Sequence, residues 1–252
     1  MAEERNDMDM DPEMIFTDEE GSNESAETGT GLTELEFRFL CASFGITTLV
    51  GYEIPPANET DEEQMQGLLN MVKHGLLIIE EDSFVVNEEL GEMMECIATR
   101  ICTMQIWSPE SDVSNCVIYI GENKAGVVAR PGQKEGEYTV LTYLPEGTLP
   151  AFLSSADIIP EAMIPEEIAE FSRELDKEGI SVPEGELTDK DGVRLEIRFY
   201  DGTDAEESVI LYVLWLNEQE LIVRDIGGVR TADHYVTNEI IPLICAQCGL
   251  GS

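Results

Sequence analysis

The sequence contains one Cys-x-x-Cys motif, Cys245-Ala246-Gln247-Cys248, and His234 precedes it by a short stretch. Two cysteines at this spacing can bind zinc or form a redox pair, and His234 could supply a third zinc ligand. A structural zinc site needs four ligands, however, and a reactive thiolate is typical of a helix N-terminus, whereas this pair follows a predicted helix. We therefore interpret Cys245 and Cys248 as structural thiols and expect neither a metal site nor a cofactor.

Other residues that could do chemistry have simpler explanations. His74 precedes Gly75 at a predicted helix end, where a partly charged imidazole interacts favourably with the helix dipole. The run Asp201-Gly202-Thr203-Asp204 lacks the ligand spacing of an EF-hand and predicts a β-turn. The sequence has neither a phosphate-binding glycine loop nor a nucleophile elbow. We therefore expect no catalytic residues and no enzymatic activity.

The balance of charge narrows the class of partner. Asp and Glu total 53 against 14 Lys and Arg, which gives a formal net charge of −39. Nucleic acids and anionic membrane surfaces attract cations, so we expect neither as a partner. The acidic excess is spread along the whole chain, which favours solubility as its explanation, and a basic partner is the alternative.

The apolar runs indicate a cytoplasmic protein. The acidic N-terminus lacks the continuous apolar stretch of a signal peptide, and the densest apolar run, residues 209–216, is far too short to span a membrane. The six cysteines are then expected to be reduced thiols.

Two regions differ in composition. Residues 1–31 are acidic and rich in Gly, Ser and Thr, so burial cannot offset the entropy of ordering them, and we predict a disordered acidic tail. Residues 32–252 contain enough apolar side chains for a core and predict a single α+β domain. A helical part with a hairpin covers 32–98, a first half extends to about residue 160, and a second half covers 161–252.

The first part of this domain predicts three helices and a hairpin. Thr33 and Glu36 are spaced as a capping box, Asp61 can cap a second helix, and a third helix is predicted over residues 87–99. A hairpin is predicted within residues 76–86. This N-terminal element is winged-helix-like, but the acidic residues at its reading positions argue against DNA, so it should serve packing or protein contact.

Short strands and helices fill the rest of the chain. Helices are predicted near residues 148–153 and 166–178 and after Thr237 or Asn238. The strands are predicted at residues 103–107, 115–120, 127–130, 138–143, 193–199, 209–216 and 221–224.

The two groups of strands have the same order, and their closing strands end at Arg130 and Arg224. Chance and an internal duplication explain this equally well. With a duplication, the fold is an antiparallel sheet made of two pseudo-two-fold halves, with helices on a face.

The layout resembles the EspG-type chaperones of type VII secretion. The residues that carry the resemblance are 35–44, His74-Gly75-Leu76-Leu77 with Phe84-Val85-Val86, 87–99, and then the two strand regions. The resemblance covers most of residues 33–250, whereas the acidic tail and the six cysteines depart from the family's pattern. It implies a cytosolic chaperone that holds a helical secretion substrate.

We therefore expect a protein-binding protein, either a chaperone or an adaptor for a secreted partner. One alternative is an acidic immunity-type protein that neutralises a basic toxin, whose association would weaken strongly with salt. A third is an enzyme with a carboxylate or Cys–His site. Aromatic residues on an open sheet face and apolar residues of the last helix are typical contact residues. The predicted partner-binding residues are Tyr119, Tyr143, Trp215, Ile240, Leu243 and Ile244.

Overall fold

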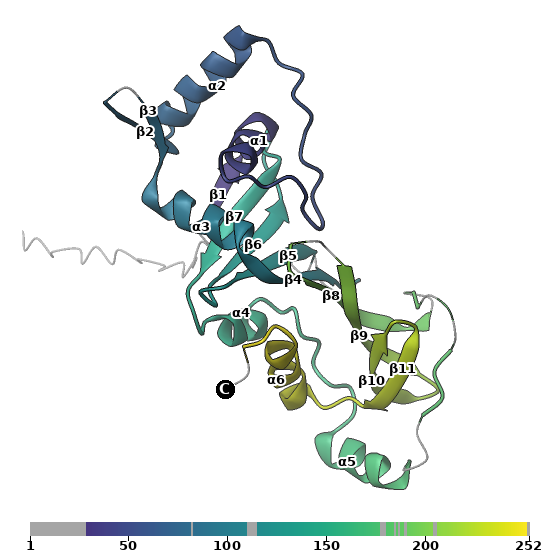
Figure 1. The fold of residues 1–252 in the computed structure, drawn as a ribbon. Coiled ribbons are helices and arrows are strands. Elements are labelled where there is room, and N and C mark those ends of the chain that lie inside the picture. The colour runs from purple at the N-terminus through teal and green to yellow at the C-terminus, as the bar shows by residue number, and fades with distance from the viewer. Residues whose placement is uncertain are drawn as a thin grey trace, which may run out of the picture.

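The part of the chain that the computed structural model describes is α+β, with six helices, a nine-stranded antiparallel sheet and a separate hairpin (Figure 1). None of the helices in the described part has both the length and the apolar composition needed to cross a membrane. The structure describes residues 29–81, 83–109, 115–176, 180–183, 185, 187–188, 191–203 and 206–250.

The large sheet has the strand order β1-β7-β6-β5-β4-β8-β9-β10-β11, and every neighbouring pair is antiparallel. The central pair is β4 and β8, in which Met104 lies opposite Phe199. The strands are β1 (Thr30–Leu32), β4 (Arg100–Trp107), β5 (Cys116–Gly121), β6 (Gly126–Pro131), β7 (Thr139–Leu144), β8 (Val193–Asp201), β9 (Glu206–Leu216), β10 (Gln219–Ile226) and β11 (Val229–His234).

One face of this sheet is covered by α4 (Leu149–Ser155) and α6 (Thr237–Gln247). The two helices contact each other and pack on the middle strands (Figure 1). Side chains on a strand alternate between faces, so Ile118 points into this core while its neighbours on β5 point the other way. This core draws residues from both halves of the sheet.

The opposite face of β5, β6 and β7 is covered by an N-terminal helical unit. Its helices are α1 (Glu34–Ser43), α2 (Asp61–Lys73) and α3 (Glu88–Ala98). Their apolar side chains pack on Val117, Tyr119 and Val127. Between α2 and α3 lies the hairpin of β2 (Leu77–Glu80) and β3 (Ser83–Val86). A smaller cluster that includes Leu187, Tyr212 and Leu221 covers part of the sheet near β9 and β10.

The predicted cap of α1 is confirmed, whereas the predicted caps of α2 (Asp61) and α6 (Thr237 or Asn238) are wrong. The capping box of Thr33 and Glu36 is confirmed. The second helix is capped by Thr60 with Glu63, so the prediction of Asp61 as the cap is wrong, and Asp61 is the first helical residue. Thr237 is likewise the first residue of α6, and its hydroxyl accepts a hydrogen bond from the Ala162 amide at 3.1 Å. In both helices the residue before the predicted cap has the extended backbone of an N-cap.

The predicted strands are present with shifted ends, and two strands were not predicted. Edge strand β11 has exposed or half-exposed residues over most of its length, which leaves little apolar pattern to find. Strand β1 begins at Thr30 and pairs with β7, so Thr30 and Gly31 belong to the sheet and not to the predicted acidic tail. Residues 1–28 of that tail lie outside the described residues.

Candidate protein-binding surfaces

Three of the six predicted contact residues are buried. Tyr119 is 1% exposed, and its hydroxyl donates a hydrogen bond to the Val50 carbonyl at 2.8 Å. Ile240 and Ile244 are fully buried where α6 packs on the sheet. The side chains of these three residues stabilise the core and have no accessible surface to offer a partner in this structure.

The other three predicted residues do not lie together. Tyr143 is half-buried against the core of the helical unit. Leu243 is half-buried on α6, beside a cavity of about 390 Å³. Trp215 is exposed near the end of β9. The structure therefore places the six residues in separate environments and not on one contact surface.

Five of the six cysteines are buried, and Cys245 is half-buried. The sulfur of Cys248 lies 3.7 Å from that of Cys102 and 3.4 Å from the sulfur of Met104. Burial raises the pKa of Cys41 to about 12 and that of Cys96 to about 11, which makes these thiols unreactive. Within the described residues, no group of three or more His, Cys, Asp and Glu side chains could hold a metal ion.

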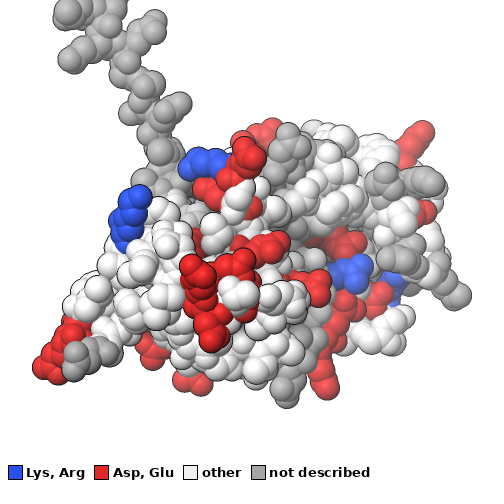
Figure 2. All heavy atoms as spheres, turned by 90° about the horizontal axis from the view of Figure 1, so that it is seen from above, with Lys and Arg blue, Asp and Glu red and all other residues white. Residues whose placement is uncertain are grey.

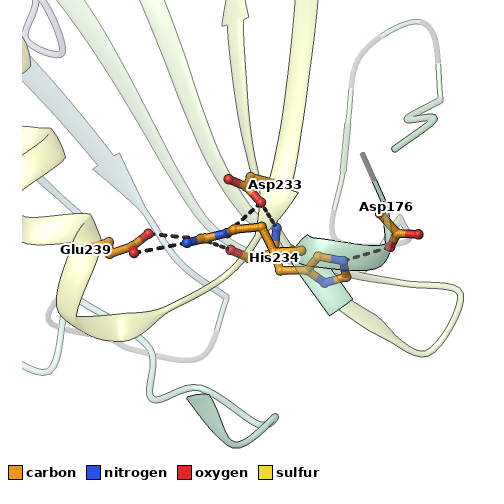
Figure 3. Close-up of polar contacts among 5 residues, drawn as sticks. Asp176, Asp233, His234 and Glu239 are labelled. Atoms are coloured by element: carbon orange, nitrogen blue, oxygen red, sulfur yellow. Dashed lines mark hydrogen bonds and ion pairs between the residues drawn. The ribbon is translucent and has the colours of Figure 1, made fainter. Parts of the chain in front are cut away.

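His234 is also held in a structural contact. Its ring is 2% exposed, and Nε2 lies 2.9 Å from the Asp176 carboxylate at the end of α5 (Glu166–Leu175) (Figure 3). Arg173 of α5 binds Asp233 and Glu239, which are both labelled in Figure 3. These polar contacts attach α5 to the edge of the sheet and to α6.

A cleft of about 650 Å³ lies between the loop near Pro183 and strands β8–β11. The two cations among its described lining residues are both paired: Arg230 with Asp225 at 2.8 Å, and Arg198 with Glu207 at 3.2 Å. The cleft therefore presents balanced charges and is a poor match for a phosphate or another free anion.

The most exposed apolar side chains of the N-terminal unit lie on α2 and the hairpin. In the hairpin, Ile79 lies opposite Phe84 on one face and Ile78 opposite Val85 on the other. All four are exposed, with Ile79 at 57%. Figure 1 shows the hairpin at the outer margin of the molecule, next to the end of α2. We call the following set the N-terminal apolar surface: Met65, Leu69, Ile78, Ile79, Phe84 and Val85.

A groove between α1 and α2 lies in the same helical unit. It has a volume of about 280 Å³ and is lined mainly by apolar side chains. The two helices approach closely at Gly67, where an added Cβ atom would lie 2.3 Å from Cδ2 of Leu35. The groove residues are Leu35, Arg38, Phe39, Ala42, Ala57, Gln64, Gly67, Leu68 and Met71.

A second exposed apolar stripe lies on α5. Ile168, Phe171 and Leu175 are 54%, 61% and 68% exposed. They follow one another at helical spacing and so lie along one side of the helix. We call these three residues the α5 face.

The exterior of the protein is rich in carboxylates. On the side of the molecule drawn in Figure 2, Asp and Glu are widespread, whereas Lys and Arg occupy only a few places. The candidate surfaces are thus apolar areas within a strongly acidic exterior, a combination that suits a partner with both apolar and basic side chains.

Comparison with models of protein families and with curated proteins finds no match to this sequence. The candidate sites are therefore defined by the geometry of this chain. The N-terminal apolar surface was not among the predicted contact residues, although a signal was present. Each hairpin strand contains three consecutive apolar residues, 77–79 and 84–86, and a lone two-stranded hairpin cannot bury both of its faces.

Proposed function

We propose that this protein is a cytoplasmic chaperone or adaptor that binds another polypeptide through its N-terminal apolar surface. The observation that carries the proposal is the exposure of apolar side chains on both faces of the β2–β3 hairpin. Each face carries a cross-strand pair of exposed apolar side chains, and exposed apolar groups of this kind are typical of interaction sites. Burial of this surface against a partner is the simplest reason for its composition.

The geometry of the hairpin supports binding of a polypeptide in particular. Its strands have four residues each and, among the residues that the structure describes, pair only with each other. A two-stranded hairpin is marginally stable in water and gains stability from a packing partner. A partner could cover either face of the hairpin or add a strand to one of its edges.

The α1–α2 groove is a second feature that supports the same proposal. Its apolar lining and its position between two helices suit an apolar side chain, or one face of a helix, from the partner. The resemblance to EspG-type chaperones would make that partner a helical secretion substrate of a type VII-like system.

Two finer features of the fold belong to this proposal. We infer an internal duplication, because four meandering strands followed by a helix occur twice, as β4–β7 with α4 and as β8–β11 with α6. The antiparallel β4–β8 pair would then lie at the pseudo-two-fold axis. The interpretation of residues 32–98 as winged-helix-like rests on their order of helices and hairpin.

The test is retention of a partner by the full chain immobilised as bait in lysate of its source cells. Three baits are compared: the unchanged chain, the double variant Ile79→Ser, Phe84→Ser, and a control, Val229→Ser. Val229 is 70% exposed on β11 and lies outside both the hairpin and the groove, so its replacement removes exposed apolar area elsewhere.

A polypeptide held by the unchanged chain and by Val229→Ser, but lost by the hairpin variant, would support the proposal. Equal retention by all three baits, or no retained polypeptide, would contradict it. Circular dichroism of each bait establishes that the variants are folded.

An acidic immunity-type protein is the second candidate, and the net charge of −39 favours it. Such a complex depends on long-range attraction between an acidic and a basic surface. Its association rate should fall steeply between low and high ionic strength, whereas binding to the apolar hairpin should change little.

A further inference from the structure

Helix α5 turns its apolar side away from the protein. A surface helix of a globular protein normally directs such a stripe toward the core. Here Ile168, Phe171 and Leu175 are all more than half exposed, and Ala169 is the only buried side chain of the helix. The packing of the described residues therefore leaves this stripe uncovered.

Polar contacts on the side of α5 opposite the apolar stripe determine its orientation. Arg173 Nε donates to Asp233 at 2.9 Å, and its NH2 group donates to the His234 carbonyl at 2.9 Å. Two positions along a helix turn through about 200°, so Phe171 projects nearly opposite to Arg173. The contacts that hold α5 in place also present the α5 face to solvent.

One side of the stripe is acidic. Glu167, Glu170 and Glu174 are exposed, and helical geometry places them as a row beside Phe171. A second copy of this chain would bring an identical acidic row and a net charge of −39 toward this one, which disfavours self-association here. A partner with basic residues beside an apolar stripe would complement both features.

We propose that the α5 face docks a cationic amphipathic helix of a partner polypeptide. Apolar side chains of that helix cover Ile168, Phe171 and Leu175, while its Lys or Arg residues pair with the glutamate row. The inference rests on the proposed function for its claim that the partner is a polypeptide. It adds the chemistry of that partner and a docking surface on α5, separate in sequence from the N-terminal apolar surface.

The probe is an 18-residue synthetic peptide of Leu and Lys, patterned so that a helix has one apolar stripe flanked by Lys. A scrambled peptide of the same composition controls for general attraction to an acidic protein. Binding of each labelled peptide to the full chain is measured by fluorescence anisotropy at 150 mM salt. We expect the patterned peptide to bind at least tenfold more tightly than the scrambled peptide.

Two variants locate the site. The double variant Phe171→Ser, Leu175→Ser should reduce the tenfold preference to less than twofold, whereas Val229→Ser should keep it. Unchanged preference in the α5 variant, or equal binding of both peptides to the unchanged chain, would overturn the inference. So would a dimer of the unchanged chain that the α5 variant converts to a monomer, since a second copy would then cover the face.

The hairpin variant Ile79→Ser, Phe84→Ser separates this inference from the proposed function. The hairpin variant should keep the peptide preference. If it also retains every natural partner, the proposed use of the hairpin fails while the α5 inference stands. If the α5 variant keeps the peptide preference while the hairpin variant loses the natural partner, the α5 inference fails and the hairpin proposal stands.

Discussion

The guanidinium of Arg173 on α5 donates two hydrogen bonds to the carboxylate of Glu239 on α6, at 3.1 and 2.9 Å. The same side chain binds Asp233 on β11. Because α5 buries only Ala169, these polar contacts and the Asp176–His234 pair account for most of its attachment to the protein. A helix held in this way should respond sharply to the loss of one side chain.

Replacement of Arg173 should loosen α5 with only a modest effect on the whole domain. Its carboxylate partners are half exposed, so we expect Arg173→Ala to lower the free energy of unfolding by about 1 kcal/mol. Amide hydrogen exchange across Glu166–Leu175 should rise more than exchange in the central strands. Arg173→Lys keeps the charge but loses the bidentate contact, so its free energy of unfolding and its α5 exchange rates should be intermediate. Equal exchange rates in all three proteins would argue against this role.

The buried pair of Arg194 and Glu220 should contribute much more to the free energy of unfolding than Arg173 does. Arg194 donates a hydrogen bond to Glu220, whose other oxygen accepts one from the Met163 amide at 2.7 Å. Glu220→Leu would leave a buried guanidinium without its carboxylate, so we expect a loss of about 3–5 kcal/mol in urea unfolding. The double variant with Arg194→Met should recover part of that loss. A single variant within about 1 kcal/mol of the unchanged chain would contradict this prediction.

The stability of the N-terminus of α2 should depend on pH through the ionisation of Glu63. A hydrogen bond from the Thr60 backbone amide, and a second from the Thr60 hydroxyl, hold the pKa of this carboxyl below its usual value. The lowered pKa means that the stabilisation is present above the unfolded-state pKa and is lost as the pH falls through the folded-state value.

The NMR titration of the Glu63 side chain measures that pKa directly. Thr60→Ala removes the hydroxyl donor and should move the pKa of Glu63 upward toward that of an unfolded chain. No upward movement in Thr60→Ala would show that the capping box does not hold the carboxylate.

Thiol labelling should single out Cys245. It is half-buried, whereas the other five cysteines are buried, and burial raises the pKa of Cys41 and Cys96 to about 12 and 11. Thiols with raised pKa values stay protonated at pH 8 and react slowly. With N-ethylmaleimide at pH 8, mass spectrometry should find Cys245 modified first and the others only after denaturation. Early modification of Cys41 or Cys96 would mean that their cores open readily.

Local signals predicted much of the fold. The capping box at Thr33 and the helix end at Gly75, whose φ is +75°, are short-range features. Side-chain hydrogen bonds determine the first, and the absence of a Cβ atom on glycine favours the second. At the second helix, Thr60 and Asp61 are both good caps, and only the observed backbone distinguishes them. Strand β11 is an edge strand with little buried surface, so its sequence carries a weak pattern.

The candidate surfaces were harder to predict, because a sequence pattern identifies an apolar side without showing what covers it. Tyr119 and Ile240 occupy regular positions on a strand and a helix, and tertiary packing buries both. The stripe of Ile168, Phe171 and Leu175 has the same kind of pattern, yet the Arg173 contacts turn it outward. The long-range contact between α5 and β11 therefore determines which side of α5 is exposed to solvent.

The most direct test of the central claim is hydrogen exchange of the hairpin amides with and without the partner retained by the unchanged chain. We predict fast exchange from Leu77 to Val86 in the free protein and strong slowing in the complex, together with slowing along α1 and α2. Unchanged hairpin exchange in a saturated complex, with protection confined to other elements, would contradict that claim.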